Sequence, residues 1–89
     1  MIATLAEMSP GQVGRVLSVD GEEHAVSRML EMGLTPGVEI AFLGTSLLGD
    51  PIEVQVRGYR LSLRKLEAMK VKVDLSSVDP VYAHGRSRF

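Results

Sequence analysis

The fold of this chain is decided by residues 27–37, which read Ser27-Arg28-Met29-Leu30-Glu31-Met32-Gly33-Leu34-Thr35-Pro36-Gly37. Apolar residues at helical spacing end at Met32, and Gly33 follows them. The residue just after a helix commonly has a left-handed backbone conformation, which glycine reaches without a Cβ clash. Pro36 and Gly37 suit the two central positions of a type II turn. The stretch therefore predicts a helix end, a tight turn and the start of a strand.

Upstream of this stretch, the sequence predicts one strand and the helix itself. Residues 12–19 are rich in β-forming residues and alternate with a period of two. Asp20 and Glu23 have the spacing of a capping box, so we expect the helix to begin there and to run to about Met32. Its expected apolar face comprises Ala25, Val26, Met29, Leu30 and Met32.

Downstream, short alternating segments predict strands at 38–43, 52–57, 60–63 and 71–75, with one helical turn at 64–69. Gly58-Tyr59 reads as a two-residue type II′ hairpin loop, because glycine stands first. Each strand is too short to bury a core alone, so the sheet is expected to curl on itself. We therefore expect a mainly β domain over residues 1–75: a small SH3-like barrel of five short strands, with an α-helix inserted after the first strand. Residues 76–89 are polar and rich in helix and strand breakers, and we expect a disordered C-terminal tail there.

Composition limits the classes of protein that this chain can represent. The 89 residues suffice for one domain, and 45% of them are hydrophobic. Cysteine is absent, which excludes disulfides, thiolate metal ligands and a cysteine nucleophile. The N-terminal residues resemble neither a signal peptide nor a membrane-spanning segment, so we expect a cytoplasmic protein without direct membrane insertion.

Charge is nearly balanced overall but unevenly distributed. The net charge is −1; residues 20–53 hold seven acids and one base, whereas residues 57–72 hold six bases and one acid. The two halves could neutralise each other in the fold. Alternatively, the second half could form a basic face for an acidic partner or a membrane-proximal surface. Nucleic acid is disfavoured as a partner because aromatic residues make up only 4% of the chain.

Two adjacent leucines, Leu47 and Leu48, stand in the loop that the glycines at 44 and 49 delimit. Adjacent residues of a loop seldom point to the same side, so one leucine could tuck inward with the loop folded over the end of the barrel. The alternative is an exposed apolar contact for a partner.

The sequence offers no catalytic constellation. His24 stands beside Glu22 and Glu23 at the expected helix start, where three successive side chains point in three directions. His84 lies in the expected tail, and neither a nucleophile motif nor a phosphate-binding glycine loop is present. We therefore predict a protein that is not an enzyme, with no catalytic residues, no cofactor and no protein metal site.

Three segments, in order and at matching spacing, carry a resemblance to a known family. Residues 28–37 resemble the (R)RL-x-x-LGL-x-PG signature of the ferrous iron transport protein A family, FeoA, with methionine at two positions where leucine is usual. Leu48-Gly49-Asp50-Pro51 before a strand resembles the second signature of the family, and residues 57–68 resemble the third, RG-x-x-L-x-LR-x-x-EA. The positions that carry this motif, to which we assign a structural role, are Arg28, Leu30, Gly33, Pro36, Gly37, Asp50, Pro51, Gly58 and Arg64.

The resemblance implies an accessory protein of bacterial ferrous iron uptake that binds the cytoplasmic GTPase domain of the permease FeoB. On this interpretation the candidate contacts are Leu47 and Leu48, with Arg57 and Arg60 on the neighbouring hairpin. Two alternatives stay open: a direct Fe(II)-binding chaperone or sensor that uses residues 22–24, and a nucleic-acid-binding small barrel. A weak homo-oligomer is also compatible with the sequence.

Overall fold

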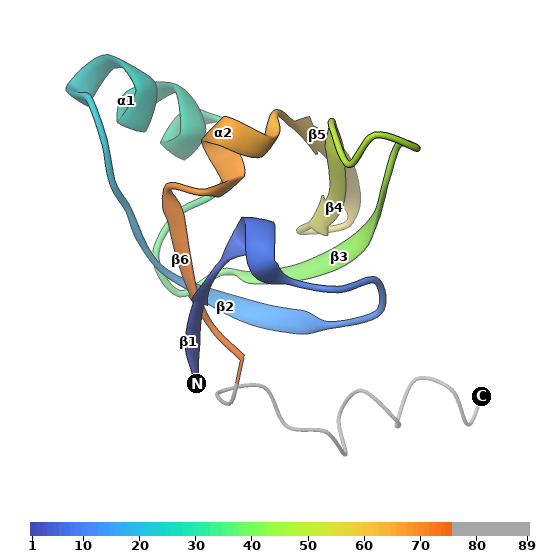
Figure 1. The fold of residues 1–89 in the computed structure, drawn as a ribbon. Helices are drawn as coiled ribbons and strands as arrows, with labels where there is room; N and C mark the ends of the chain where they lie inside the picture. The colour runs from blue at the N-terminus through green and yellow to red at the C-terminus, as the bar shows by residue number, and fades with distance from the viewer. Residues whose placement is uncertain (76–89) are drawn as a thin grey trace.

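The protein is described here from a computed structural model, which defines the structure of residues 1–75. Two helices and a 3-10 turn interrupt six strands (Figure 1). In chain order these are β1 (Ile2–Thr4), the 3-10 turn η1 (Leu5–Glu7), β2 (Val13–Val19), α1 (Glu23–Glu31), β3 (Glu39–Thr45), β4 (Ile52–Val56), β5 (Tyr59–Leu63), α2 (Lys65–Ala68) and β6 (Val71–Asp74). The expected tail at residues 76–89 lies outside the described residues.

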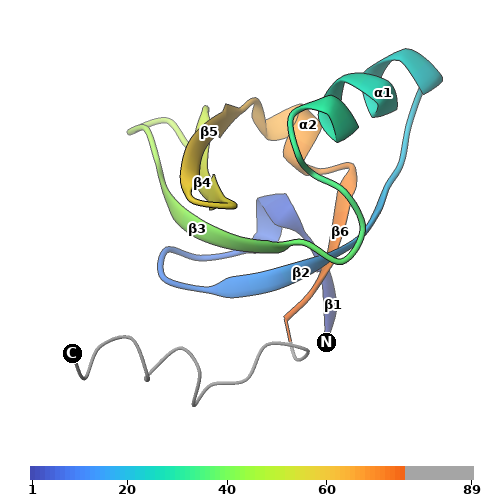
Figure 2. The ribbon, with the colours of Figure 1, turned by 180° about the vertical axis from the view of Figure 1, so that it is seen from behind.

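The strands form one antiparallel sheet in the order β1-β6-β2-β3-β4-β5. Figures 1 and 2 show this sheet curling so that β4 and β5 turn back over its concave side. The mainly β class is therefore confirmed, but the strand count of five was wrong, and α1 follows the second strand rather than the first. The missed strand, β1, has only three residues and exists because Ala3 pairs with Val73, a contact that no local pattern reports.

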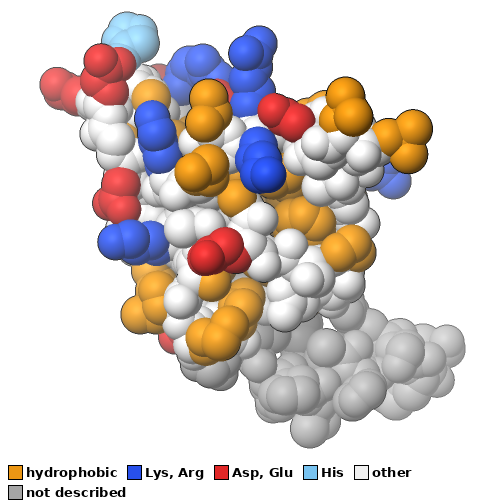
Figure 3. Space-filling view, in the orientation of Figure 1, with side chains coloured by type: hydrophobic (Ala, Val, Ile, Leu, Met, Phe, Trp, Pro, Cys, Tyr) orange, Lys and Arg blue, Asp and Glu red, His pale blue; other side chains and the backbone are white. Residues whose placement is uncertain are grey.

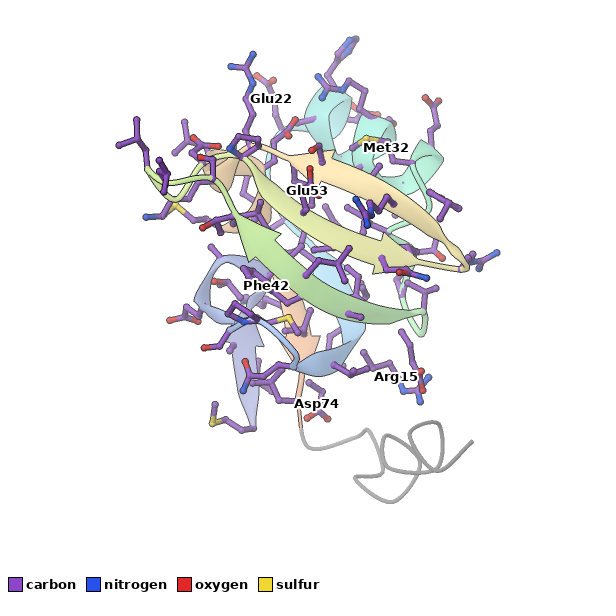
Figure 4. All side chains as sticks on the ribbon, turned by 90° about the vertical axis from the view of Figure 1, so that its right-hand side faces the viewer. Arg15, Glu22, Met32, Phe42, Glu53 and Asp74 are labelled. Carbon is purple, nitrogen blue, oxygen red and sulfur yellow. The ribbon has the colours of Figure 1, made fainter. Side chains whose placement is uncertain are left out.

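The core fills the concave side of the curled sheet. Its residues are apolar, and no buried polar or charged side chain occurs among residues 1–75. The core consists of Leu5, Met8, Val16, Met29, Leu34, Ile40, Phe42, Ile52, Val54, Val56, Leu63, Ala68, Val71 and Val73. Phe42 on β3, labelled in Figure 4, belongs to this set. The turn η1 lies against α2 and β6, so its Leu5 closes the open end of the core.

Helix α1 ends as the sequence predicts. Gly33 has a φ of 105°, its amide donates to the Leu30 carbonyl at 3.0 Å, and the Leu34 amide donates to the Met29 carbonyl at 3.1 Å. These are the two hydrogen bonds of a Schellman motif, and they place the side chain of Leu34 in the core, where it is fully buried. The predicted apolar face was partly wrong, because Leu30 remains 37% exposed.

The start of α1 differs from the prediction. Its N-cap is Glu22, without a side-chain cap, so the capping box of Asp20 and Glu23 does not form. Asp20 instead joins β6: its amide donates to the Lys70 carbonyl at 2.8 Å, and its Oδ2 lies 3.6 Å from Lys72 Nζ. A long-range contact has thus replaced the local cap.

The turn at Pro36-Gly37 is confirmed. The Val38 amide donates to the Thr35 carbonyl at 3.1 Å, and Gly37 has the positive φ, 95°, that a type II turn requires at its third position. The Gly37 amide also donates to the Val16 carbonyl at 2.8 Å, which fastens the turn to β2. The helix end and the turn therefore fix how β3 enters the sheet.

The hairpin between β4 and β5 turns one residue earlier than predicted. Val56 pairs with Tyr59, so the two loop residues are Arg57 and Gly58, with φ values of 52° and 88°. Positive φ at both positions defines a type I′ turn, not the expected type II′ turn at Gly58-Tyr59. Arg57 thus occupies a left-handed conformation that costs a non-glycine residue free energy.

We expect Arg57→Asn to raise the free energy of unfolding by about 0.5–1 kcal/mol, because asparagine is the preferred first residue of a type I′ turn. Urea denaturation of both proteins measures this change. An unchanged or lowered midpoint would mean that the Arg57 side chain itself stabilises the hairpin.

Candidate partner-binding surface

The loop between β3 and β4, residues 46–51, carries the two leucines outside the barrel. The relative exposure of Leu47 is 104% and that of Leu48 is 92%, so neither side chain tucks inward and the loop does not fold over the core. Its base is closed by hydrogen bonds: the Gly49 amide donates to the Ser46 carbonyl at 2.9 Å, and Ser46 Oγ donates to the Asp50 carbonyl. A firmly closed base thus presents two adjacent apolar side chains to solvent.

A shallow hollow lies on the outer face of the sheet beside this loop. It is lined by Leu43, Gly44, Thr45, Ser46, Pro51, Glu53 and Arg60. Glu53 Oε1 on β4 lies 3.8 Å from Arg60 Nη1 on β5, an open ion pair between two exposed side chains (Figure 4 labels Glu53). Ser46 and Pro51 of the leucine loop therefore line the same hollow as the predicted Arg60.

The fourth predicted contact, Arg57, lies elsewhere. The loop joins β4 at Ile52, whereas Arg57 follows Val56 at the other end of that strand. Four residue steps of about 3.4 Å separate those ends by about 14 Å. Arg57 lines a second hollow, with Val13 and Val38 among its neighbours. Arg60 thus shares a hollow with Ser46 and Pro51 of the leucine loop, whereas Arg57 lines the other hollow.

The motif residues of the second and third segments link the loop to α2. Asp50 Oδ1 accepts from the Lys65 amide at 3.0 Å, which ties the loop to the first residue of α2, and Pro51 follows a cis peptide bond. The Arg64 amide donates to Glu67 Oε1 at 3.0 Å, and Arg28 Nη2 lies 2.7 Å from Glu67 Oε2, which joins α1 to α2. These contacts join the loop, α1 and α2, and the structural role that we assign to the motif residues stays a prediction.

The outer surface of α2 carries two apolar side chains whose exposure the sequence did not predict. Leu66 and Met69 have helical spacing in the turn predicted at 64–69, yet they are 70% and 52% exposed, whereas Ala68 is fully buried. Figure 3 shows hydrophobic and basic side chains interleaved at the end of the molecule where Figure 1 places α2 and the β3–β4 loop. The sequence signal for this surface was the density of basic residues around Leu66, because such a density favours a helical turn that faces solvent.

The candidate iron ligands Glu22, Glu23 and His24 are all exposed at the start of α1. Within residues 1–75, no three or more histidine and carboxylate side chains lie close enough together to hold a metal ion. In the same part of the chain, no helix has the length and hydropathy that crossing a membrane requires.

Comparison with known proteins identifies the family. The family model of the FeoA domain matches residues 3–75, which include both hollows, the leucine loop and α2. The chain belongs to the FeoA family. A FeoA–FeoB fusion protein of Porphyromonas gingivalis, described as an Fe(2+) transport protein A joined to the Fe(2+) transporter FeoB, is 33% identical to it over 73 residues. That match covers 82% of this chain and 9% of the relative, so the chain spans less than a tenth of the fusion protein's length.

Solved FeoA structures share the fold. A FeoA-like protein from Clostridium acetobutylicum is 34% identical, with a TM-score of 0.77, over 83% of this chain and 86% of that one. The FeoA of Stenotrophomonas maltophilia, solved with zinc, is 32% identical, with a TM-score of 0.72, over 83% and 92% of the two chains. That protein is described as an SH3 domain protein and as a candidate activating factor of bacterial ferrous iron transport. The SH3-like fold expected for this FeoA chain is thereby confirmed.

Proposed function

We propose that this FeoA protein is a non-enzymatic accessory protein of bacterial ferrous iron uptake, which binds and modulates the cytoplasmic GTPase domain of a FeoB-like permease. Membership of the FeoA family relates the chain to ferrous iron transport. The fusion of FeoA to FeoB in one relative supports a physical association of the two, since fused domains are held at high effective concentration. On this proposal the protein works in the cytoplasm.

The observation that carries the proposal is the pair of exposed leucines at residues 47 and 48. Monomeric proteins rarely expose large apolar side chains side by side without a partner. Fully burying one leucine is worth about 1.5–3 kcal/mol, so the pair could contribute about 3–6 kcal/mol to association. That contribution corresponds to at least a hundredfold in affinity.

Arg60 and Glu53 would set the orientation of the partner. Their side chains are 74% and 47% exposed, and their 3.8 Å ion pair is open to solvent, so it contributes little to folding. Both groups are free to exchange this contact for charged or polar groups of the partner at the rim of the hollow. Such rim contacts adjust specificity and association rate more than affinity.

We expect Leu47→Ser/Leu48→Ser to weaken binding to the cognate GTPase domain by about a hundredfold or more, because both apolar anchors are lost. Retention of the soluble GTPase domain on the immobilised FeoA protein measures this. The matched control is Ile2→Ser, which removes a side chain 66% exposed on β1, away from the loop, and should bind like the unmodified protein. Equal retention of the double variant and the unmodified protein would reject the leucine pair as the contact.

A further inference from the structure

The outward side of α2 forms a second exposed surface, which the leucine loop does not include. We call it the basic α2 surface, and it consists of Arg64, Lys65, Leu66, Met69 and Lys70. Leu66 and Met69 stand three residues apart, so they are neighbours on one helical turn, and both are mostly exposed. Arg64, Lys65 and Lys70 flank them in the sequence and are also exposed, and the Lys70 side chain lies beside Gly21.

The three bases of this surface have no ion pair within residues 1–75, where the five ion pairs involve other cations. The nearest acids are already engaged. Asp50 accepts from the Lys65 amide, and the two oxygens of Glu67 accept from the Arg64 amide and from Arg28. Arg64, Lys65 and Lys70 thus have no ion pair of their own within residues 1–75, although the net charge of the chain is −1.

The composition of the basic α2 surface, in which exposed apolar side chains stand beside exposed cations, matches an anionic lipid bilayer. Both hollows of the described structure are lined by residues of the β2–β5 region, and neither includes a residue of this surface. Leu66 and Met69 therefore line neither of these two hollows, and they are 70% and 52% exposed. Exposed apolar side chains beside cations can enter the headgroup region of a bilayer, which needs no matching groove.

We propose that the basic α2 surface binds the surface of an anionic lipid bilayer. Leu66 and Met69 enter the boundary between headgroups and acyl chains, and Arg64, Lys65 and Lys70 lie among the anionic headgroups. The contact is peripheral and needs no spanning segment. It goes beyond docking to the GTPase domain and does not depend on it, because the two contacts use different residues.

The acids of α1 restrict the orientation of this contact. Glu22, Glu23 and Glu31 are exposed on α1, and an anionic bilayer repels them. The protein must therefore approach through α2, with the N-terminal end of α1 held away from the headgroups. A nitroxide at position 66 should accordingly lie deeper in the bilayer than one at position 23, and the absence of cysteine from the chain allows each site to be labelled alone.

Co-sedimentation with vesicles of equal parts phosphatidylglycerol and phosphatidylcholine tests the proposal on the full chain. Each Lys or Arg near an anionic surface contributes about fivefold to partitioning, so Arg64→Gln/Lys65→Gln/Lys70→Gln should lower it by on the order of a hundredfold. Leu66→Ser/Met69→Ser should lower it as well. Pure phosphatidylcholine vesicles, or salt of about 0.5 M, should release the unmodified protein.

A charge-matched control distinguishes an effect of the position of the bases from an effect of the net charge of the protein. Arg57→Gln/Arg60→Gln/Lys72→Gln removes the same number of bases outside α2 and should keep most of the vesicle binding. Equal losses in the two triple variants, or no binding of the unmodified protein to anionic vesicles, would overturn the proposal.

Binding to the GTPase domain distinguishes the two surfaces. The α2 variants should retain that domain like the unmodified protein, whereas Leu47→Ser/Leu48→Ser should lose it and should still bind vesicles. If the α2 variants lose the GTPase domain and the unmodified protein ignores vesicles, the basic α2 surface is part of the protein interface and the lipid proposal is wrong.

Discussion

Leu34→Ala is expected to lower the free energy of unfolding by about 3–4 kcal/mol, the largest effect that we predict for one substitution. Leu34 is fully buried, and the backbone bond from its amide to the Met29 carbonyl holds its side chain in the core. Removing its methyl groups leaves a cavity that a small core cannot easily close. A chain of this size has a total stability on the order of 5–13 kcal/mol, so the loss is a large part of the whole.

Thermal unfolding and urea denaturation of Leu34→Ala measure this loss, with Leu47→Ala as the control. The control makes the same chemical change at a side chain with a relative exposure of 104%, and its stability should change by less than about 0.5 kcal/mol. Similar losses at the two positions would contradict the burial that the structure assigns to them.

Gly33→Ala is expected to lower the free energy of unfolding by about 2–3 kcal/mol, for two reasons. The φ of 105° is strained for any residue with a Cβ. A Cβ at this position would also collide with the hydroxyl of Tyr59, which donates a hydrogen bond to the Met32 carbonyl. Relieving the collision would break that bond, at a further cost of about 1 kcal/mol.

Alanine substitutions at two other glycines separate the cost of backbone strain from the cost of the steric clash. Gly37 has a φ of 95°, but no atom lies within 4 Å of the place that a Cβ would occupy, so Gly37→Ala should show the strain alone. At Gly44, φ is not positive and the space is open, so Gly44→Ala should be nearly neutral. Tyr59→Phe in the Gly33→Ala background should cost less than in the unmodified protein. Equal melting temperatures for all three alanine variants would show that α1 does not end as described.

Local sequence signals predicted those parts of the fold that local physics determines. Gly33 and Gly37 stand where the backbone needs a positive φ, and their neighbours Leu34 and Pro36 complete a helix end and a turn through contacts within a few residues. Inferences of this kind need no knowledge of the remaining chain, which explains why the helix end and the type II turn were right.

The errors arose where distant residues determine the outcome. Asp20 had the spacing of a helix cap but bonds with Lys70 and Lys72, which lie far along the sequence. The register of β4 and β5 moved the hairpin turn to Arg57-Gly58, although the glycine signal alone favoured the next position. Sheet pairing overrode the local pattern in each case, through residues far along the chain for Asp20 and through the whole β4–β5 ladder for the hairpin.

The sequence indicated candidate residues for the partner-binding surface, but it did not show which of them lie close together. Two adjacent leucines in the loop left open either a side chain tucked inward or an exposed apolar contact; the structure leaves both exposed, and the contact with a partner stays a prediction. Sequence proximity grouped Arg57 with them, but the length of β4 places it at the opposite end of the hairpin. A basic face over residues 57–72 was one alternative from the sequence, but a one-turn helix has too few residues to show that Leu66 and Met69 face outward.

The central claim, that this FeoA protein binds the GTPase domain of a FeoB-like permease, is tested most directly by calorimetric titration of the soluble cognate GTPase domain with the unmodified protein. We predict saturable binding that Leu47→Ser/Leu48→Ser weakens by about a hundredfold or more. The absence of saturable binding by the unmodified protein, whatever nucleotide occupies the GTPase domain, would contradict the account.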